Sequence, residues 1–160
     1  MIKAIIGRKG SGKTKILLKD ILAKAQPAEG EGKASTLICI ESGDTFDREI
    51  PINVRLIKMS DYPVSEIESF LAFLYGLAAR DYDISDIFID SIYRCVQNEK
   101  AKKAADYEED KQLILEMDIV ELFKQLHAFS ESQHVDLTFT LTLDEADIPK
   151  ELKSYIDELA

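Results

Sequence analysis

Short apolar runs alternate with segments of helical periodicity along the first part of the chain. Residues 2–6 form an apolar run that ends at Gly7, and we predict that they form a strand. A helix is predicted next, because its apolar positions fall on one face: Ile16, Leu17, Ile21, Leu22 and Ala25. After a turn-rich connector at 27–32, the apolar run 36–40 ends at Glu41 and predicts a second strand. The first 40 residues therefore predict a strand–helix–strand unit.

The same alternation continues through the middle of the chain. Residues 53–57 predict a short strand, and Pro63 is expected to open a helix. The apolar positions of that helix recur at helical spacing: Val64, Ile67, Phe70, Leu71, Leu74 and Leu77. The most apolar strand is predicted at 87–89 and is closed by Asp90. The segment 97–110 is nearly all polar, charged or alanine, which favours a mobile charged loop or a solvated helix.

Helical periodicity resumes after the polar segment. It runs through Leu113, Met117, Val120, Phe123 and Leu126, and predicts one helix. A β-rich run at 135–143 and an amphipathic piece at 149–159 follow. Because strands with buried character alternate with helices, we predict an α/β fold, a three-layer α/β/α sandwich with a mainly parallel central sheet.

Composition and charge narrow the class of partner. A chain of 160 residues with 46% hydrophobic and 31% charged residues predicts a single globular domain over 1–160. Thirty acidic residues against 20 basic ones give a formal net charge of -10. Since contacts to nucleic-acid phosphates need clustered lysine and arginine, we expect the isolated chain not to bind DNA.

Two further features bear on the compartment. Cys39 and Cys95 each lie in an apolar stretch, which is typical of buried, reduced core residues. No stretch approaches the roughly 18 apolar residues of a membrane span. Residues 1–6 give way to glycines too early for the apolar region of a signal peptide. We therefore expect a cytoplasmic protein with no membrane partner.

One motif carries the candidate chemistry, and it lies directly between the first predicted strand and the first predicted helix. Its eight positions fit G-x-x-x-x-G-K-[ST]: Gly7, Arg8, Lys9, Gly10, Ser11, Gly12, Lys13 and Thr14. The glycines allow successive backbone N–H groups to turn inward around a phosphate, where a side chain would block the approach. The start of the following helix adds its positive dipole end. These residues predict a phosphate-binding loop for ATP.

The motif implies roles for its last two side chains and for an acid elsewhere. The Lys13 ammonium is expected to meet the β- and γ-phosphates, and the Thr14 hydroxyl to complete the shell of Mg²⁺. Asp90 ends a buried strand, which we expect beside the strand of the loop, and is the candidate second anchor for the metal. The residue after it is Ser91 and not a glutamate, so we look to Glu41, at the end of the second strand, for the carboxylate that activates water.

Two further segments resemble a known family. They are Cys-Ile-Glu-Ser-Gly-Asp-Thr-Phe at 39–46 and Ile-Phe-Ile-Asp-Ser-Ile at 87–92. With the loop, they resemble the ATPase core of the RecA superfamily of P-loop NTPases, in a truncated or minimal version. The resemblance implies that Lys13 and Thr14 take phosphate and magnesium, that Asp90 supports the metal, that Glu41 activates water, and that Arg48 stacks on adenine.

The chain also departs from that family. Acids stand in the run Thr-Leu-Thr-Leu-Asp-Glu at 140–145, where the family carries a polar sensor pair, and Thr142 and Asp144 are possible substitutes. The segment 98–110 corresponds to the DNA-binding loop of recombinases, but its acids outnumber its lysines.

Three functions stay open at this stage. One is a slow ATP hydrolase that depends on a partner for an arginine finger, and another is a nucleotide-dependent regulator acting through a protein partner or as a homo-oligomer. The third is a small-molecule P-loop kinase, which is disfavoured because 97–110 contains no arginine to form a lid.

Overall fold

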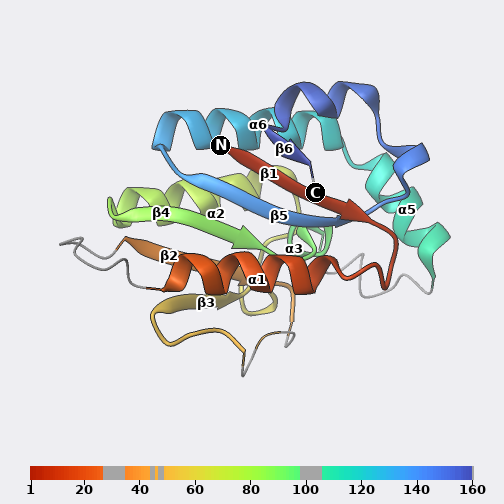
Figure 1. Cartoon of the computed structure of the whole chain (residues 1–160). Helices are drawn as coiled ribbons and strands as arrows, with labels where there is room; N and C mark the ends of the chain where they lie inside the picture. Colours follow the sequence, from red (N-terminus) through yellow and green to blue (C-terminus); the bar gives the residue numbers. More distant parts are fainter. Residues whose placement is uncertain (27–34, 44–45, 47–48, 98–105, 160) are drawn as a thin grey trace.

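The computed structural model describes residues 1–26, 35–43, 46, 49–97 and 106–159. In these residues all six strands are parallel and form one sheet in the order β3-β2-β4-β5-β1-β6 (Figure 1). The strands are β1 (Ile2–Gly7), β2 (Thr36–Glu41), β3 (Val54–Lys58), β4 (Ile84–Ile89), β5 (Asp136–Thr142) and β6 (Glu158–Leu159). The helices are α1 (Lys13–Ala25), α2 (Ile67–Arg80), α3 (Ile92–Val96), α5 (Tyr107–Glu116) and α6 (Ile119–Gln133), with short 3-10 turns η1 (Met59–Asp61), η2 (Glu145–Asp147) and η3 (Lys150–Tyr155).

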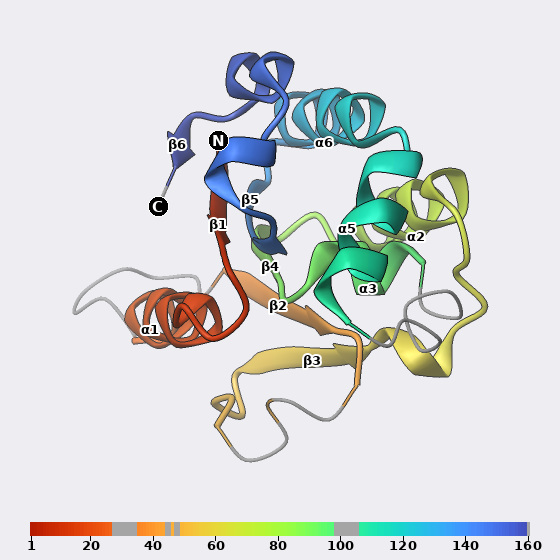
Figure 2. The same ribbon diagram turned by 90° about the vertical axis from the view of Figure 1, so that its right-hand side faces the viewer.

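Helices cover both faces of the sheet, which confirms the predicted α/β class with three layers. Viewed along the sheet, α1 lies on one side and α2, α3, α5 and α6 lie on the other (Figure 2). The smaller core lies under α1 and includes Leu17, Cys39 and Phe88, whereas the larger core includes Phe70 and Leu122. Burial of strands on both faces explains why their sequences read as continuous apolar runs.

The order of the strands corrects one expectation. The strand that ends before Asp90 is not beside the strand of the glycine loop, because β5 lies between β1 and β4. In the same register Gly7 of β1 is opposite Thr142 of β5, and Phe88 of β4 is opposite Thr138. Side chains of β5 therefore lie between the loop and the acid at the end of β4.

Two helix boundaries also differ from the prediction. The helix expected from Pro63 begins at Ile67, because Glu66 is extended and its N–H donates to Ser69 Oγ over 3.2 Å, which caps the helix there. The helix expected through Leu126 is two helices, because the Asp118 carboxylate accepts from the Glu121 N–H over 3.1 Å and starts α6 anew.

The polar segment 97–110 is described only in part, since residues 98–105 lie outside the described residues. Its end is helical, as the alternative of a solvated helix expected, because the Asp106 carboxylate accepts from the Glu109 N–H and caps α5. The end of the chain differs from the prediction. The amphipathic piece expected at 149–159 is η3 followed by β6, a strand that the sequence pattern did not predict.

Two expectations about cysteines and membranes can be compared with the structure. Cys39 and Cys95 are buried and carry free thiols, as expected. Among the helices of the described residues, none has the length and apolar character needed to cross a lipid bilayer.

Candidate functional site

The loop between β1 and α1 has the backbone conformation that its glycines permit. Gly10 and Gly12 have φ angles of 78° and 87°, in the left-handed region that side chains disfavour. A Cβ at either position would meet no heavy atom within 4 Å, so the requirement for glycine is conformational. The first turn of α1 follows at once, with the Ile16 N–H donating to the Gly12 carbonyl over 3.1 Å. The loop therefore ends at a helix N-terminus, as an anion-binding loop does.

Gly7 serves a different purpose from the one expected. Its φ is not positive, but a Cβ there would lie 2.7 Å from the Ser11 Oγ. The Gly7 carbonyl also accepts a hydrogen bond of 3.2 Å from the Leu143 N–H. Gly7 thus leaves room for the Ser11 side chain at the end of β1. The positive φ angles of the loop are at Gly10 and Gly12.

The Lys13 side chain lies along the inside of the loop. Its Nζ donates to the Arg8 carbonyl over 2.7 Å. Partial burial lowers the pKa of Lys13 from its ordinary value, and the nearby negative charge of Asp90 opposes this by raising it. The ammonium is therefore held at the loop, within the electrostatic field of the acid at the end of β4.

Thr14 and Asp90 are brought together as expected. The Thr14 Oγ1 donates to the Asp90 Oδ1 over 3.2 Å, and Asp90 is only 4% exposed. Thr140 of β5 donates to the same carboxylate oxygen over 2.9 Å and accepts from the Ser91 N–H over 2.7 Å. Asp90 therefore keeps a fixed orientation, because hydroxyls from α1 and β5 both point at it. Thr140 was not assigned this role from the sequence.

Glu41 lies next to Asp90 but is held differently. Ile40 pairs with Ile89, so Glu41 and Asp90 follow at the carboxyl ends of neighbouring strands. Glu41 is fully buried, and its Oε2 accepts from the Phe46 N–H over 2.8 Å. It does not line the pocket described below. Arg48, the candidate adenine contact, lies outside the described residues.

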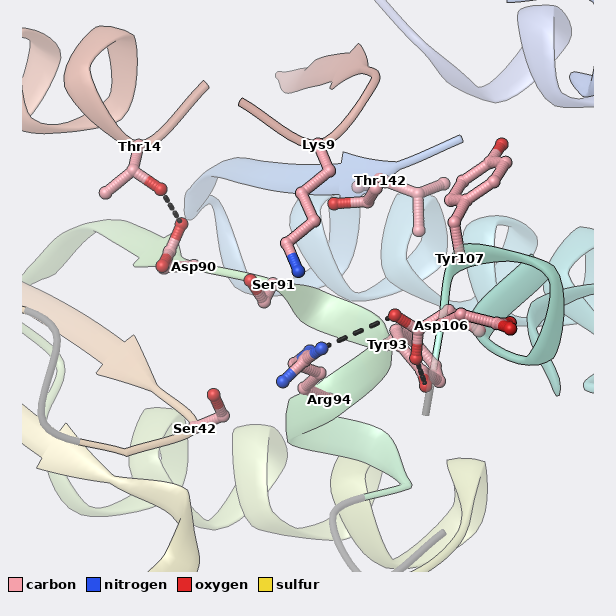
Figure 3. A pocket seen from close by; sticks show the side chains of 12 residues that line it. Lys9, Thr14, Ser42, Asp90, Ser91, Tyr93, Arg94, Asp106, Tyr107 and Thr142 are labelled. Atoms are coloured by element: carbon pink, nitrogen blue, oxygen red, sulfur yellow. Dashed lines mark hydrogen bonds and ion pairs between the residues drawn. The ribbon is translucent and has the colours of Figure 1, made fainter. Parts of the chain in front are cut away.

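A polar pocket of about 370 Å³ opens from the Thr14–Asp90 pair toward α5. Figure 3 shows Lys9 entering it from the glycine loop and Arg94 from α3. The other residues that line it are Ser42, Ser91, Tyr93, Asp106, Tyr107, Asp110, Leu141 and Thr142. The sequence alone assigned no role to Arg94, Tyr107 or Asp110.

The first turn of α5 is tied to both sides of this pocket. Asp110 accepts a hydrogen bond from the Tyr93 hydroxyl and pairs with Arg94, with 3.4 Å between Arg94 Nη2 and Asp110 Oδ2. The Tyr107 hydroxyl accepts from the Asp144 N–H over 2.9 Å. Asp144 in turn pairs with Arg8, with 3.0 Å between Arg8 Nε and Asp144 Oδ1.

These contacts separate the two candidate sensor residues. Thr142 lines the pocket, whereas Asp144 holds Arg8 outside it. The Arg8 side chain is 76% exposed, and its Nε pairs with Asp144, which follows β5. Of the eight residues of the motif, Lys9 and Thr14 are the two that line the pocket.

The Thr14 hydroxyl and the Asp90 carboxylate are oxygen donors of the kind that Mg²⁺ takes. Among the described residues no group of three or more histidine, cysteine or acidic side chains forms a metal cluster. A hydroxyl and a carboxylate are hard oxygen ligands, and Mg²⁺ usually keeps few protein ligands and takes the others from phosphates and water. The Thr14–Asp90 pair suits this coordination.

The chain was also compared with known proteins. No protein-family model matches it, and a search of curated proteins gives no significant match.

Proposed function

We propose that this protein is a P-loop NTPase of the RecA-like type that binds Mg-ATP, and that it acts as a slow ATP hydrolase or nucleotide-dependent regulator. The observation that carries the proposal is the hydrogen bond between Thr14 and Asp90. It joins the last residue of the loop motif to the acid that follows β4, 76 positions further along the chain. The left-handed Gly10 and Gly12 support it, because they allow the loop amides to surround a phosphate.

Different residues of the chain bind the phosphates of ATP and its magnesium ion. The loop amides and the Lys13 ammonium bind the β- and γ-phosphates, while Thr14 and Asp90 hold Mg²⁺. When bound, the metal neutralises charge on the phosphate oxygens. Thr140 orients Asp90 through its 2.9 Å hydrogen bond.

Hydrolysis then requires only water as a co-reactant. The water oxygen forms a bond to the γ-phosphorus, and the bond from that phosphorus to the bridging oxygen breaks. The electron pair of the broken bond stays on ADP, and the water gives up a proton. Glu41 is the candidate acceptor of that proton, because it is the carboxylate beside Asp90 at the end of β2.

A second candidate function is transfer of the γ-phosphate to a hydroxyl of a small molecule. The observation that favours it is the continuation of the pocket past Thr14 and Asp90 to Tyr107, Asp106 and Asp110. In that case an acceptor hydroxyl takes the place of water, and its proton leaves as the phosphate ester forms. ATP consumption that rises with an added acceptor, with no matching release of phosphate, is the result that identifies a kinase.

Calorimetric titration with ATP in the presence of Mg²⁺ tests the proposal. We expect one nucleotide per chain for the wild type and for Lys15→Ala, a matched control on the exposed side of α1. Lys13→Ala is expected to lose most of the affinity. Unchanged affinity in Lys13→Ala would mean that the loop is not the phosphate site. Phosphate release slower than about one per minute marks a regulator, because typical enzymes turn over once per second or faster.

A further inference from the structure

Arg94 lies on the wall of the pocket that faces the glycine loop. It is on α3, the short helix that directly follows Asp90 and Ser91. Figure 3 shows its guanidinium and the Lys9 ammonium extending from opposite sides into the same space. The pocket is continuous from Thr14 and Asp90 to Arg94. Arg94 therefore lines the same pocket as the Thr14–Asp90 pair.

The Arg94 guanidinium is held by Asp110 through one of its N–H donors. Its hydrogen-bond partner among the described residues is the Asp110 Oδ2, at 3.4 Å. Asp110 is itself fixed, because it also accepts from the hydroxyl of Tyr93, whose side chain is buried. A guanidinium carries five N–H donors, so most of them remain available to a ligand. Asp110 thus positions Arg94 while leaving the side that faces the pocket open.

The charges around the pocket bear on the kind of ligand that Arg94 can bind. The acids Asp90, Asp106 and Asp110 line it, and an anionic ligand needs cations to enter against them. Arg8 does not supply one, because it pairs with Asp144 and does not line the pocket. Arginine forms two parallel hydrogen bonds to a phosphate, which fits the planar group on α3.

We propose that Arg94 contacts the terminal phosphate of a bound nucleoside triphosphate, in addition to Lys13. The inference rests on the proposed function, in which Lys13 and the loop amides bind the β- and γ-phosphates and Thr14 and Asp90 would hold the magnesium ion. Arg94 lines the same pocket as Thr14 and Asp90 and enters it from the side opposite Lys9 (Figure 3), so its guanidinium would meet the terminal phosphate from the side away from the loop. The chain then carries its own arginine for the charge of the γ-phosphate. Asp110 is a positioning residue.

Affinities for two nucleotides test this contact without relying on turnover. The wild type, Arg94→Ala and Arg80→Ala are titrated with Mg²⁺ and either ADP or the non-hydrolysable β,γ-imido analogue of ATP. Arg80 is an exposed arginine in the last turn of α2 and serves as the matched control. In Arg94→Ala we expect the affinity for the ATP analogue to fall roughly tenfold or more and the affinity for ADP to stay within about twofold, because charge-assisted hydrogen bonds to the terminal phosphate are lost.

Two further measurements distinguish a residue that contacts the phosphate from one that only positions another side chain. Asp110→Asn keeps the size of the side chain and is expected to weaken the ATP analogue less than Arg94→Ala does. If the wild type hydrolyses ATP, free guanidinium ion at millimolar concentration is expected to restore part of the turnover that Arg94→Ala loses. A purely structural role of Arg94 would give no such rescue.

The outcomes distinguish this inference from the proposed function. A wild type that binds neither nucleotide overturns both. A wild type that binds both, with Arg94→Ala binding both equally well, overturns only the role of Arg94. An equal loss for ADP and for the ATP analogue also overturns the assignment to the terminal phosphate, since ADP lacks that group.

Discussion

The Thr14 hydroxyl donates a hydrogen bond of 3.2 Å to the Asp90 carboxylate across 76 positions of sequence. Thr14 stands in the first turn of α1, and Asp90 directly follows β4, so the bond joins the glycine loop to the far side of β5. A ligand that needs an oxygen from each residue has both of them available at one point. The candidate site depends on this relationship more than on any other.

We predict that Asp90→Asn removes the magnesium dependence of nucleotide binding. The amide oxygen of asparagine still accepts hydrogen bonds from Thr14 and Thr140, so the fold is expected to be retained, but the negative charge that attracts the metal is lost. Titration of ATP with Mg²⁺ and with excess chelator measures the effect. The wild type is expected to bind ATP at least tenfold more weakly with chelator, and Asp90→Asn about equally weakly in both conditions.

A matched control for that charge change is Asp61→Asn, at an exposed position of η1. It is expected to behave as the wild type. If Asp90→Asn kept the full benefit of magnesium, the metal would have to be bound elsewhere.

We predict that replacing glycine by alanine destabilises the fold at Gly12 of the glycine loop and stabilises it at Gly76 of α2. Gly12→Ala forces a side chain into a residue with φ of 87°, which costs about 1–2 kcal/mol of unfolding free energy, and it turns a loop amide away from the phosphate. Gly76 lies within α2, where a Cβ meets nothing within 4 Å, so Gly76→Ala is expected to stabilise the fold by about 0.5–1 kcal/mol. Urea unfolding of both variants, with and without Mg-ATP, provides the measurement.

Mg-ATP should raise the urea midpoint of the wild type and of Gly76→Ala, because a ligand that binds only the folded state stabilises it. Gly12→Ala is expected to show little of this shift. A full shift in Gly12→Ala would show that the conformation of the loop is not needed for binding.

The glycine loop and the acid at the end of β4 could be predicted because their signals are local. The motif 7–14 fixes a turn between adjacent elements, and the apolar run at 87–89 marks a buried strand that an acid closes. The position of β5 between β1 and β4 has no such local signal, since it depends on how crossovers place strands far apart in sequence. Thr140 went unassigned for this reason, although it bonds Asp90.

The wall of the pocket was missed for a different reason. The composition of 97–110 favoured a mobile charged loop or a solvated helix and did not decide between them. Asp106 followed by Glu108, Glu109 and Asp110 is the pattern of a capped helix start, with acids in the first turn. That signal was present in the sequence. The partners of Asp110 on α3 were not, because the contact with Tyr93 and Arg94 is tertiary.

Glu41→Gln separates binding from hydrolysis. A glutamine oxygen still accepts the hydrogen bond from the Phe46 N–H, so the local fold and ATP affinity are expected to persist. The carboxylate that would take the proton from water is lost, and phosphate release is expected to fall about 100-fold or more. Binding by calorimetry and phosphate release on the same preparation check this. Unchanged turnover would assign Glu41 to holding Phe46 and the segment after β2.

We predict that the two buried thiols make the folded protein less stable at alkaline pH. Burial is the main cause that raises the pKa of Cys39 and of Cys95, and the charges of Glu41 and Asp90 raise both further. The folded protein therefore keeps both protons above pH 8.5, where thiols of the unfolded chain ionise. Because the unfolded state then binds fewer protons, the free energy of unfolding falls as pH rises, and the slope for each thiol approaches about 1.4 kcal/mol per pH unit well above pH 8.5. Urea unfolding between pH 7.5 and about pH 9.5 stays below the ordinary pKa of tyrosine, which keeps the contribution of Tyr93, whose pKa is also raised by burial, small. The Cys39→Ala, Cys95→Ala double variant is expected to lose most of the slope, and an unchanged slope would assign the alkaline effect to other groups.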